Sequence, residues 1–460
     1  MMKINLTRIV MASSVLLGLF LFCSCSNSPD ESNALNDQAS NINHSISTGE
    51  NSIEADSGRY MLHGVNFSPY TRSDQDPNLM TRISEEQIQS HLEVLSPYTR
   101  WIRTFGSTLG MENASRIARE MNFHTAIGAW LDSDSSTNDS EMRNLITAAK
   151  EGYVDLAIVG SEVLYRGDLT ADELIGYIDQ FREEVPNVPV TTAETYQVWL
   201  DYPELIDHVD VVMSNYYAYW EGIPVDDAMT YLNNRYQRVV ARAKGKNVIV
   251  SETGWPGDGD VIGQAVADPA NASYYFLNFI SWARTEGVDY FYFEAFDEPW
   301  KQKYEGVQGA NWGIWTSDGT MKEGMSDVFK GVVINDNWTA ECAPGGAGAP
   351  AIEFTHVPAK GTSENLEGEV RHVDTNNYGV AVYIYVGGWW TKPYWNEPVT
   401  TISCDGSFVT DITTGGSDSS ASRIAAFLIP VDYAPPSMSG NANLPDEIYD
   451  MALNYEIVDR

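Results

Sequence analysis

Eight short apolar runs that alternate with amphipathic stretches constrain the fold of this chain more than any other feature. The runs span residues 61–67, 101–105, 125–130, 154–160, 188–192, 209–213, 248–250 and 290–293. Each is short enough to be a buried strand, and the stretches between them show the apolar spacing of helices. Strands and helices that alternate over roughly 280 residues predict a (β/α)8 TIM barrel of the α/β class.

Helix starts support this alternation. Capping-box patterns stand at 84–87 and at 170–173. The apolar stripes that follow are Ile88, Leu92 and Leu95 in the first helix and Leu174, Tyr177, Ile178 and Phe181 in the second. A doubly wound open sheet is the main competing fold. That fold usually has a glycine-rich phosphate loop after its first strand, and this sequence has none there.

Two glutamates stand at strand ends, where a barrel places its chemistry. Glu162 follows the run at 154–160, and Glu252 follows the run at 248–250. Strands four and seven face each other across the barrel, so the two carboxylates are expected to converge. A retaining glycosidase uses such a pair about 5–5.5 Å apart, one as nucleophile and one as acid/base. A single glutamate at a strand end is more often an ion-pair or capping residue, but the pair favours catalysis.

The residues around these glutamates carry a family resemblance. The strings VGSE at 159–162 and SETGWP at 251–256 resemble glycoside hydrolase family 17, the β-1,3-glucanases and related transglycosylases. The likeness covers residues 60–322, and it implies that Glu252 is the nucleophile, Glu162 the acid/base and β-1,3-glucan the substrate. One departure is Ser161, where the family usually has an asparagine that bonds the sugar 2-hydroxyl. Serine is shorter and would need a bridging water.

The resemblance extends beyond the last predicted strand. Glu298 and Lys301 stand where the family has a glutamate and a lysine that organise the site. Lys301 is expected to pair with Glu298 or to contact the nucleophile. The alternative is a surface ion pair, which contributes little.

Other residues at strand ends are candidates for sugar contacts. They are Asn66, Tyr70, Arg103, Phe105, Glu194, Asn215, Tyr216, Tyr217 and Trp255. Aromatic rings offer flat faces on which a pyranose can stack. Trp255 adjoins the nucleophile and is the strongest of these candidates, although core packing is the alternative for each.

The N-terminal segment is predicted to direct export. Lys3 and Arg8 precede an apolar run at 9–22 that is too short for a comfortable membrane span. Cys25 follows the small Ser24, as in a bacterial lipobox. We therefore expect a lipoprotein signal peptide at 1–25 and a lipid on Cys25. The lipid would anchor the exported protein to a bacterial membrane, at the cell surface or in the periplasm. Residues 26–58 are expected to form a flexible tether. An ordinary cleaved secretory signal is the alternative.

The C-terminal quarter has a different pattern. A barrel domain at 59–337 is expected to end in a Pro- and Gly-rich linker at 338–350, followed by an all-β sandwich at 351–460. Alternation over 380–386 predicts a strand with Val380, Val382, Ile384 and Val386 on one face and Ala381, Tyr383 and Tyr385 on the other. The aromatic stretch at 386–395 is interpreted either as a glucan-binding surface or as packing against the barrel.

Composition limits the partners. The formal net charge of -36 makes nucleic acid an unfavourable partner, whereas a neutral glucan is unaffected by it. No Cys/His cluster suggests a metal, no cofactor is implied, and Cys342 and Cys404 are free to pair if they lie close enough. Hydrolysis of β-1,3-glucan is the leading function. Transglycosylation with the same glutamates and a non-catalytic glucan-binding surface lipoprotein are the alternatives.

Overall fold

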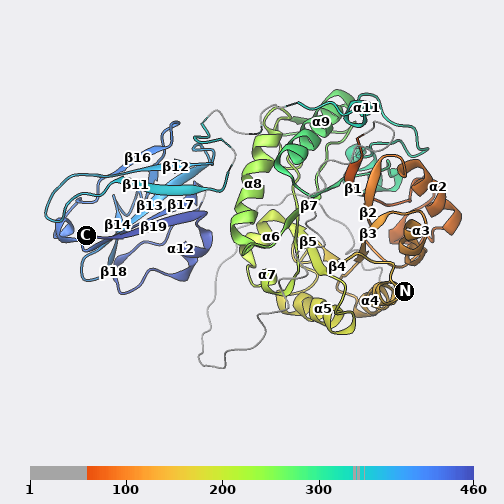
Figure 1. Ribbon diagram of the computed structural model, residues 1–460, viewed down its shortest axis with the longest axis horizontal. Helices are drawn as coiled ribbons and strands as arrows, with labels where there is room; N and C mark the ends of the chain where they lie inside the picture. Colours follow the sequence, from red (N-terminus) through yellow and green to blue (C-terminus); the bar gives the residue numbers. More distant parts are fainter. Residues whose placement is uncertain (1–59, 335–337, 339–341, 347, 432) are drawn as a thin grey trace, which may run out of the picture.

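The computed structural model describes residues 60–460 apart from 335–337, 339–341, 347 and 432. It consists of a barrel of strands surrounded by helices and a smaller all-β region beside it (Figure 1). The predicted signal peptide, the lipidated Cys25 and the tether lie outside the described residues. Among the described residues, no helix is both long and apolar enough to cross a membrane.

Eight parallel strands form the barrel, as predicted. They are β1 (Leu62–Asn66), β2 (Thr99–Arg103), β3 (His124–Ala129), β4 (Leu156–Ser161), β5 (Val190–Thr195), β6 (Val212–Asn215), β7 (Val248–Glu252) and β10 (Phe291–Tyr292). Their order is β10-β1-β2-β3-β4-β5-β6-β7. A bridge between Val250 and Tyr290 joins the two ends of this sheet. The ring is therefore closed, and the open doubly wound alternative is wrong.

Helices cover the outside of the barrel. They are α2 (Glu85–Leu95), α3 (Ala114–Glu120), α4 (Ser135–Lys150), α5 (Ala171–Glu184), α6 (Tyr196–Asp201), α7 (Leu205–His208), α8 (Ala228–Arg242), α9 (Pro269–Glu286) and α11 (Ser326–Phe329). Both predicted starts are confirmed. Ser84 accepts a hydrogen bond from the Gln87 backbone, and Thr170 forms a reciprocal capping box with Glu173. The predicted apolar stripes face the barrel, with only Tyr177 half-buried.

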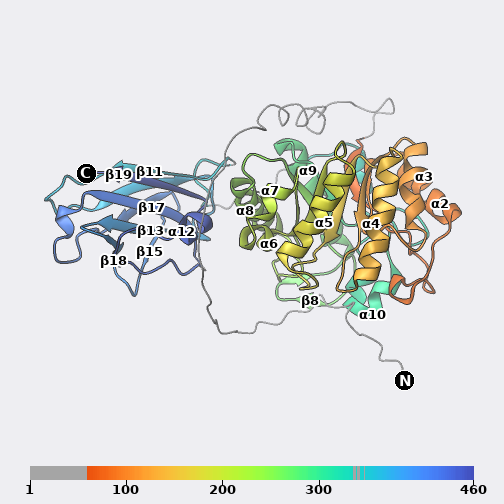
Figure 2. The same cartoon turned by 90° about the horizontal axis from the view of Figure 1, so that it is seen from below.

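Loops after the strands build the mouth of the barrel. A hairpin of β8 (Val261–Ile262) and β9 (Ala265–Val266) follows β7, and α10 (Gln302–Glu305) follows β10. Short 3-10 helices η1 (Pro77–Leu79), η2 (Met111–Asn113), η3 (Pro299–Lys301) and η4 (Val307–Ala310) complete this side. Figure 2 shows β8 and α10 on the same side of the molecule. This side contains the C-terminal ends of the strands, where the glutamates are expected.

The C-terminal region is a β-sandwich, as predicted. A three-stranded sheet contains β11 (Ala351–His356), β12 (Leu366–Arg371) and β16 (Ser407–Thr410). The larger sheet contains β13 (Tyr378–Tyr385), β14 (Trp389–Lys392), β15 (Val399–Thr401), β17 (Arg423–Pro430), β18 (Ser439–Asn441) and β19 (Asn454–Asp459). Val380, Val382 and Ile384 pack between the sheets, and Ala381 and Tyr383 pack with α12 (Asp446–Met451) on the outer face. The predicted alternation along β13 is confirmed.

The junction between the two parts differs slightly from the prediction. Trp338 lies in the core of the barrel, where its indole donates to Asn278 and its carbonyl oxygen accepts from Asn233. The barrel therefore extends past the predicted end at 337. Cys342 and Cys404 form a disulfide, which ties the start of the sandwich to the turn before β16.

Candidate active site

The two predicted glutamates lie at the same end of the barrel. Glu252 is the last residue of β7, and Glu162 directly follows β4. Arg103 ends β2 and Asn215 ends β6. All four side chains are buried. Closure of the barrel therefore brings together residues that are up to 149 positions apart in the sequence.

Glu252 is held by two strong donors. The Nη1 atom of Arg103 lies 2.7 Å from Oε1, and the Tyr217 hydroxyl donates to Oε2 over 2.7 Å. The Ser161 hydroxyl lies 3.4 Å from Oε1 and accepts from Nη2 of Arg103 over 3.0 Å. A buried carboxylate needs such partners, because an unpaired buried charge is very costly. The guanidinium therefore compensates the charge of Glu252, and the two hydroxyls hold its orientation.

Glu162 has a different environment. Its Oε1 atom accepts one hydrogen bond, from Nδ2 of Asn215 over 2.8 Å. Burial and the nearby negative charge of Glu252 raise the pKa of Glu162 to about 7. The bond from Asn215 and the charges of Arg166 and Arg103 oppose this rise. A carboxyl group with a pKa near 7 can give up and take back a proton at neutral pH.

The chain turns sharply at Glu162. Its φ angle of +53° lies in the left-handed region, which a residue with a side chain adopts at a cost. Arg166 holds this turn, because its guanidinium donates to the Ser161 carbonyl and, over 2.7 Å, to the Leu131 carbonyl. The same guanidinium lies 4.2 Å from the ring centroid of Trp130. The segment that carries Glu162 is thus braced against the loop after β3.

A second group of buried charges lies beyond β10. The Nζ atom of Lys301 lies 2.6 Å from Oε2 of Glu298 and 2.6 Å from Oε2 of Glu294. The predicted contact between Lys301 and Glu298 is confirmed, and the surface ion-pair alternative is wrong because all three side chains are buried. The prediction missed Glu294. Its place just after the last strand is the same signal that located Glu162.

Aromatic rings line the space beside the carboxylates. Phe105 is half-buried, lies 4.8 Å from the Arg103 guanidinium and faces the ring of Phe293, with centroids 6.2 Å apart. Tyr217 packs edge-on against Phe293 at 5.6 Å and against Trp312 at 5.5 Å. Phe105 is therefore close to the site and partly open to solvent. Its predicted contact with a sugar stays a prediction.

The prediction of Tyr216 as a substrate contact is wrong. Tyr216 has no exposed surface, and its ring stacks on Tyr196 with centroids 6.0 Å apart. Successive side chains of an extended segment point to opposite sides. Tyr217, one position on, therefore points into the barrel and reaches Glu252, while Tyr216 packs outward under the helices.

The stacking role predicted for Trp255 is also wrong. Trp255 is only 1% exposed, so it offers no free face to a sugar ring. Its indole nitrogen donates to the Val266 carbonyl over 2.9 Å, and its ring packs against Tyr219 and Tyr275. Trp255 instead packs under the β8–β9 hairpin, on the side that faces the barrel core, and bonds to β9.

Two further candidates for sugar contacts are support residues. Glu194 is fully buried on β5 and accepts from the Leu164 backbone over 2.9 Å, and burial raises its pKa to about 8. Asn66 is fully buried at the end of β1, where it accepts from Arg103 over 2.8 Å and donates to the Ser251 carbonyl. Each holds a residue or segment next to a catalytic candidate.

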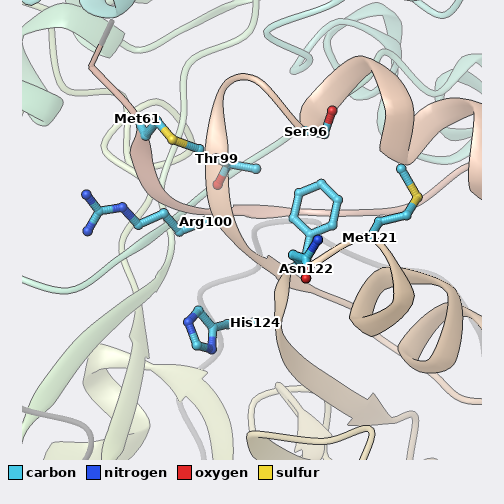
Figure 3. Close-up of a pocket in the computed structure, with 8 residues that line it drawn as sticks. Met61, Ser96, Thr99, Arg100, Met121, Asn122 and His124 are labelled. Carbon is cyan, nitrogen blue, oxygen red and sulfur yellow. The ribbon is translucent and has the colours of Figure 1, made fainter. Parts of the chain in front are cut away.

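A hollow of about 240 Å³ lies at the opposite end of the barrel. Figure 3 draws the residues that line it, which are Met61, Ser96, Thr99, Arg100, Met121, Asn122, Phe123 and His124. Thr99 begins β2 and His124 begins β3, so the hollow is at the N-terminal ends of the strands. It contains neither glutamate and is separate from the candidate active site.

A closed (β/α)8 barrel with two buried glutamates at its mouth is an architecture that glycoside hydrolases use. Comparison with known families agrees with this class. The profile of the BtgE/BtgC glycoside hydrolase domain matches residues 64–313, a range that includes Glu162 and Glu252. The chain belongs to this family of glycoside hydrolases, and the resemblance to family 17 seen in the sequence is confirmed.

Individual relatives match the barrel-sized half of the chain. A glucan 1,3-β-glucosidase of Candida albicans is 30% identical over 271 residues, which are 52% of this chain and 86% of that protein. A glucan 1,3-β-glucosidase of Schizosaccharomyces pombe is 34% identical over 254 residues, 51% of this chain and 78% of that protein. The family 17 β-1,3-glucanosyltransferase of Rhizomucor miehei superposes with a TM-score of 0.52 at 31% identity, covering 60% of this chain and 98% of that one. An active-site mutant of that enzyme has been solved in complex with laminaritriose.

Proposed function

We propose that this protein cleaves β-1,3-glucan with retention of anomeric configuration, with Glu252 as nucleophile and Glu162 as acid/base. The unequal surroundings of the two buried glutamates carry the assignment of roles. Glu252 has a cation and a phenol as partners, whereas Glu162 has one amide and a pKa raised to about 7. The names of the glucan 1,3-β-glucosidases among the relatives support the choice of substrate.

The proposed reaction has two steps. In the first, an oxygen of Glu252 attacks the anomeric carbon while Glu162 gives its proton to the departing glycosidic oxygen. This step leaves a glycosyl ester on Glu252 and an ionised Glu162. In the second, Glu162 takes a proton from water, whose oxygen attacks the anomeric carbon and releases Glu252. Both residues return to their starting forms, and the double inversion retains the configuration.

The other buried residues are assigned supporting roles. Arg103 and Tyr217 donate hydrogen bonds to Glu252 and would orient its carboxylate for attack on the anomeric carbon. Asn215 contacts Glu162 and orients its proton. Ser161, at the position of the family's asparagine, is already bonded to Arg103, so we expect only a water-mediated contact with the sugar.

The direct test compares the wild type with Glu252→Gln on a linear β-1,3-glucan, with products resolved by size. We expect shorter fragments from the wild type and a loss of at least about 1,000-fold in rate from the variant, because the amide cannot form the ester. NMR of the first product should show the β-anomer before mutarotation. An α-anomer as first product would overturn the retaining mechanism.

A control variant tests whether the loss of activity comes from the site itself or merely from the loss of one negative charge. Glu204 is an exposed glutamate on the barrel, and Glu204→Gln removes the same charge at the surface. This variant should keep the wild-type rate. Glu162→Gln should lose activity on glucan but still form the glycosyl ester from an aryl glucoside, whose leaving group needs no proton. Equal losses on both substrates would contradict the acid/base role.

Transglycosylation is the second candidate. It is favoured by the likeness to the Rhizomucor miehei β-1,3-glucanosyltransferase. In that reaction a sugar hydroxyl, instead of water, would take up the glycosyl group from Glu252. Products longer than the starting oligosaccharide would assign the protein to this activity. Binding without any product would favour the third alternative, a non-catalytic glucan-binding lipoprotein.

The place of action is a separate proposal that rests on the N-terminal sequence alone. We expect export and a lipid on Cys25. Incorporation of labelled palmitate into the wild type but not into Cys25→Ser would support the anchor. Equal labelling of the two proteins would contradict it.

A further inference from the structure

The aromatic stretch of the sandwich divides into buried and exposed rings. Trp389 is buried on β14, and Trp390 is half-buried against Gly440 of β18. Tyr394 and Trp395 are 51% and 60% exposed. The first two rings therefore serve the packing of the sandwich, whereas the last two are not accounted for by packing.

The two exposed rings sit on a short turn between β14 and β15. The Glu397 backbone donates to the Tyr394 carbonyl over 3.2 Å, which closes a four-residue turn with Trp395 inside it. The indole nitrogen of Trp395 donates to the Met438 carbonyl over 3.2 Å, just before β18. One edge of the indole is thus fixed to a neighbouring segment while most of the ring remains open to solvent.

The start of the turn is held as firmly. The Pro393 carbonyl accepts from the Thr414 hydroxyl over 2.8 Å, and this hydroxyl also accepts from Nζ of Lys392 over 2.9 Å. Lys392 is buried and forms an ion pair with Asp418. A buried cation and several hydrogen bonds therefore hold the loop at 393–398, which we name the aromatic turn.

We propose that the aromatic turn is a binding site for a β-1,3-glucan chain, separate from the active site. This inference rests on the substrate of the proposed function. The apolar faces of pyranose rings stack on Tyr and Trp rings, and preordered rings lose little conformational freedom on binding. Asn396 and Glu397 in the turn and Asn441 on β18 are exposed and offer partners for sugar hydroxyls.

A neutral polysaccharide suits this surface better than an acidic partner. The chain carries a formal net charge of -36, which opposes acidic ligands, and Glu397 is the only charged residue within the aromatic turn. Figure 2 shows β15 and β18 on the same side of the molecule as β8 and α10, which belong to the mouth of the barrel.

The test measures retention of the whole protein on insoluble linear β-1,3-glucan. All proteins carry Glu252→Gln, so that the polymer is not consumed, and the free fraction is measured after sedimentation at increasing glucan concentrations. We expect Tyr394→Ala together with Trp395→Ala to raise the apparent Kd about tenfold. The matched control is Tyr455→Ala, which removes a tyrosine that is 48% exposed on β19 of the same sandwich. It should change the apparent Kd less than twofold.

A second measurement separates this site from the proposed function. With Glu252 intact, the double variant should hydrolyse a short soluble β-1,3-oligosaccharide at the wild-type rate and the insoluble glucan several-fold more slowly. If retention depends on Trp395 but the protein has no glucanase activity, the proposed function is contradicted and the binding site at the aromatic turn is supported. Unchanged retention of a double variant that unfolds at the wild-type temperature would overturn the site. Equal retention on insoluble β-1,4-glucan would overturn its assignment to β-1,3-linked chains.

Discussion

At the scale of single residues, two identical side chains acquire different chemistry from their neighbours. Glu252 contacts a guanidinium and a phenol, and its charge is compensated. Glu162 accepts one bond from an amide and faces the negative charge of Glu252, so that its pKa rises to about 7. The two carboxyl groups therefore have unlike surroundings, which the proposed double displacement requires of its nucleophile and its acid/base.

This difference predicts a pH dependence. In the proposed mechanism the acid form of Glu162 is the active one in the first step, so kcat/KM should fall as the pH rises through about 7. Asn215→Ala removes a hydrogen bond that lowers the pKa of Glu162, and it should therefore move this basic limb to higher pH. The measurement is kcat/KM on a short soluble β-1,3-oligosaccharide between about pH 5 and pH 9. A limb that stays in place or moves to lower pH in the variant would contradict the assignment.

At the scale of elements, the segment after β4 is the part of the barrel whose shape matters most to the site. Glu162 has a left-handed backbone there, and no regular element holds the following residues. Arg166 bonds two carbonyl oxygens, lies over Trp130 and pairs with Asp168 over 2.7 Å. Glu194 holds the same segment from β5. Side-chain contacts therefore supplement the backbone hydrogen bonds of this segment, among them the bond from the Glu162 amide to the Ala193 carbonyl.

We predict that Arg166→Met displaces Glu162 without unfolding the barrel. The variant loses its donors to the Ser161 and Leu131 carbonyls, and kcat on glucan should fall about 10- to 100-fold because the proton donor is misplaced. Activity on an aryl glucoside with a good leaving group should fall much less. As a control, Arg182→Met removes a half-exposed arginine that pairs with Asp210 on the outside of the barrel and should leave both rates unchanged. Equal losses on the two substrates would show that Arg166 has only a structural role.

At the scale of the whole molecule, a barrel is joined to a sandwich through a short connection. Trp338 belongs to the core of the barrel, and the disulfide from Cys342 to Cys404 belongs to the sandwich. Few residues therefore separate the last barrel contact from the first covalent constraint of the sandwich. An ion pair of 3.9 Å between Arg242 on α8 and Asp450 on α12 is one further contact between the two parts.

We predict that the disulfide stabilises the sandwich alone. Its cysteines are separated by 62 residues, and replacing both by serine should lower the free energy of unfolding of the sandwich by about 2–4 kcal/mol. Calorimetry should show a lower midpoint for one transition and an unchanged midpoint for the barrel, with unchanged activity on a soluble oligosaccharide. Reduction of the wild type should reproduce this result. A shift of the barrel transition would contradict the prediction.

Local patterns in the sequence were sufficient for the architecture and for the two central carboxylates. Period and length of the apolar runs distinguish strands from helices, and their regular alternation is compatible with few folds. Glu162 and Glu252 could be recognised because each stands at the C-terminal end of a buried strand, so that barrel closure alone determines their position. The capping boxes and the alternation along β13 are equally local.

Only the tertiary structure decided which neighbours serve these carboxylates. Tyr216 and Tyr217 are alike in sequence, and the direction of the chain at the end of β6 determines which of them faces Glu252. Trp255 lies close to Glu252 in the sequence but is covered by the β8–β9 hairpin, and Glu294 meets Lys301 only because the chain folds back after β10. The sequence by itself determined the strands, their order along the chain and the two glutamates. Burial and partners of individual side chains depend on segments distant in sequence, which only barrel closure and loop packing bring together.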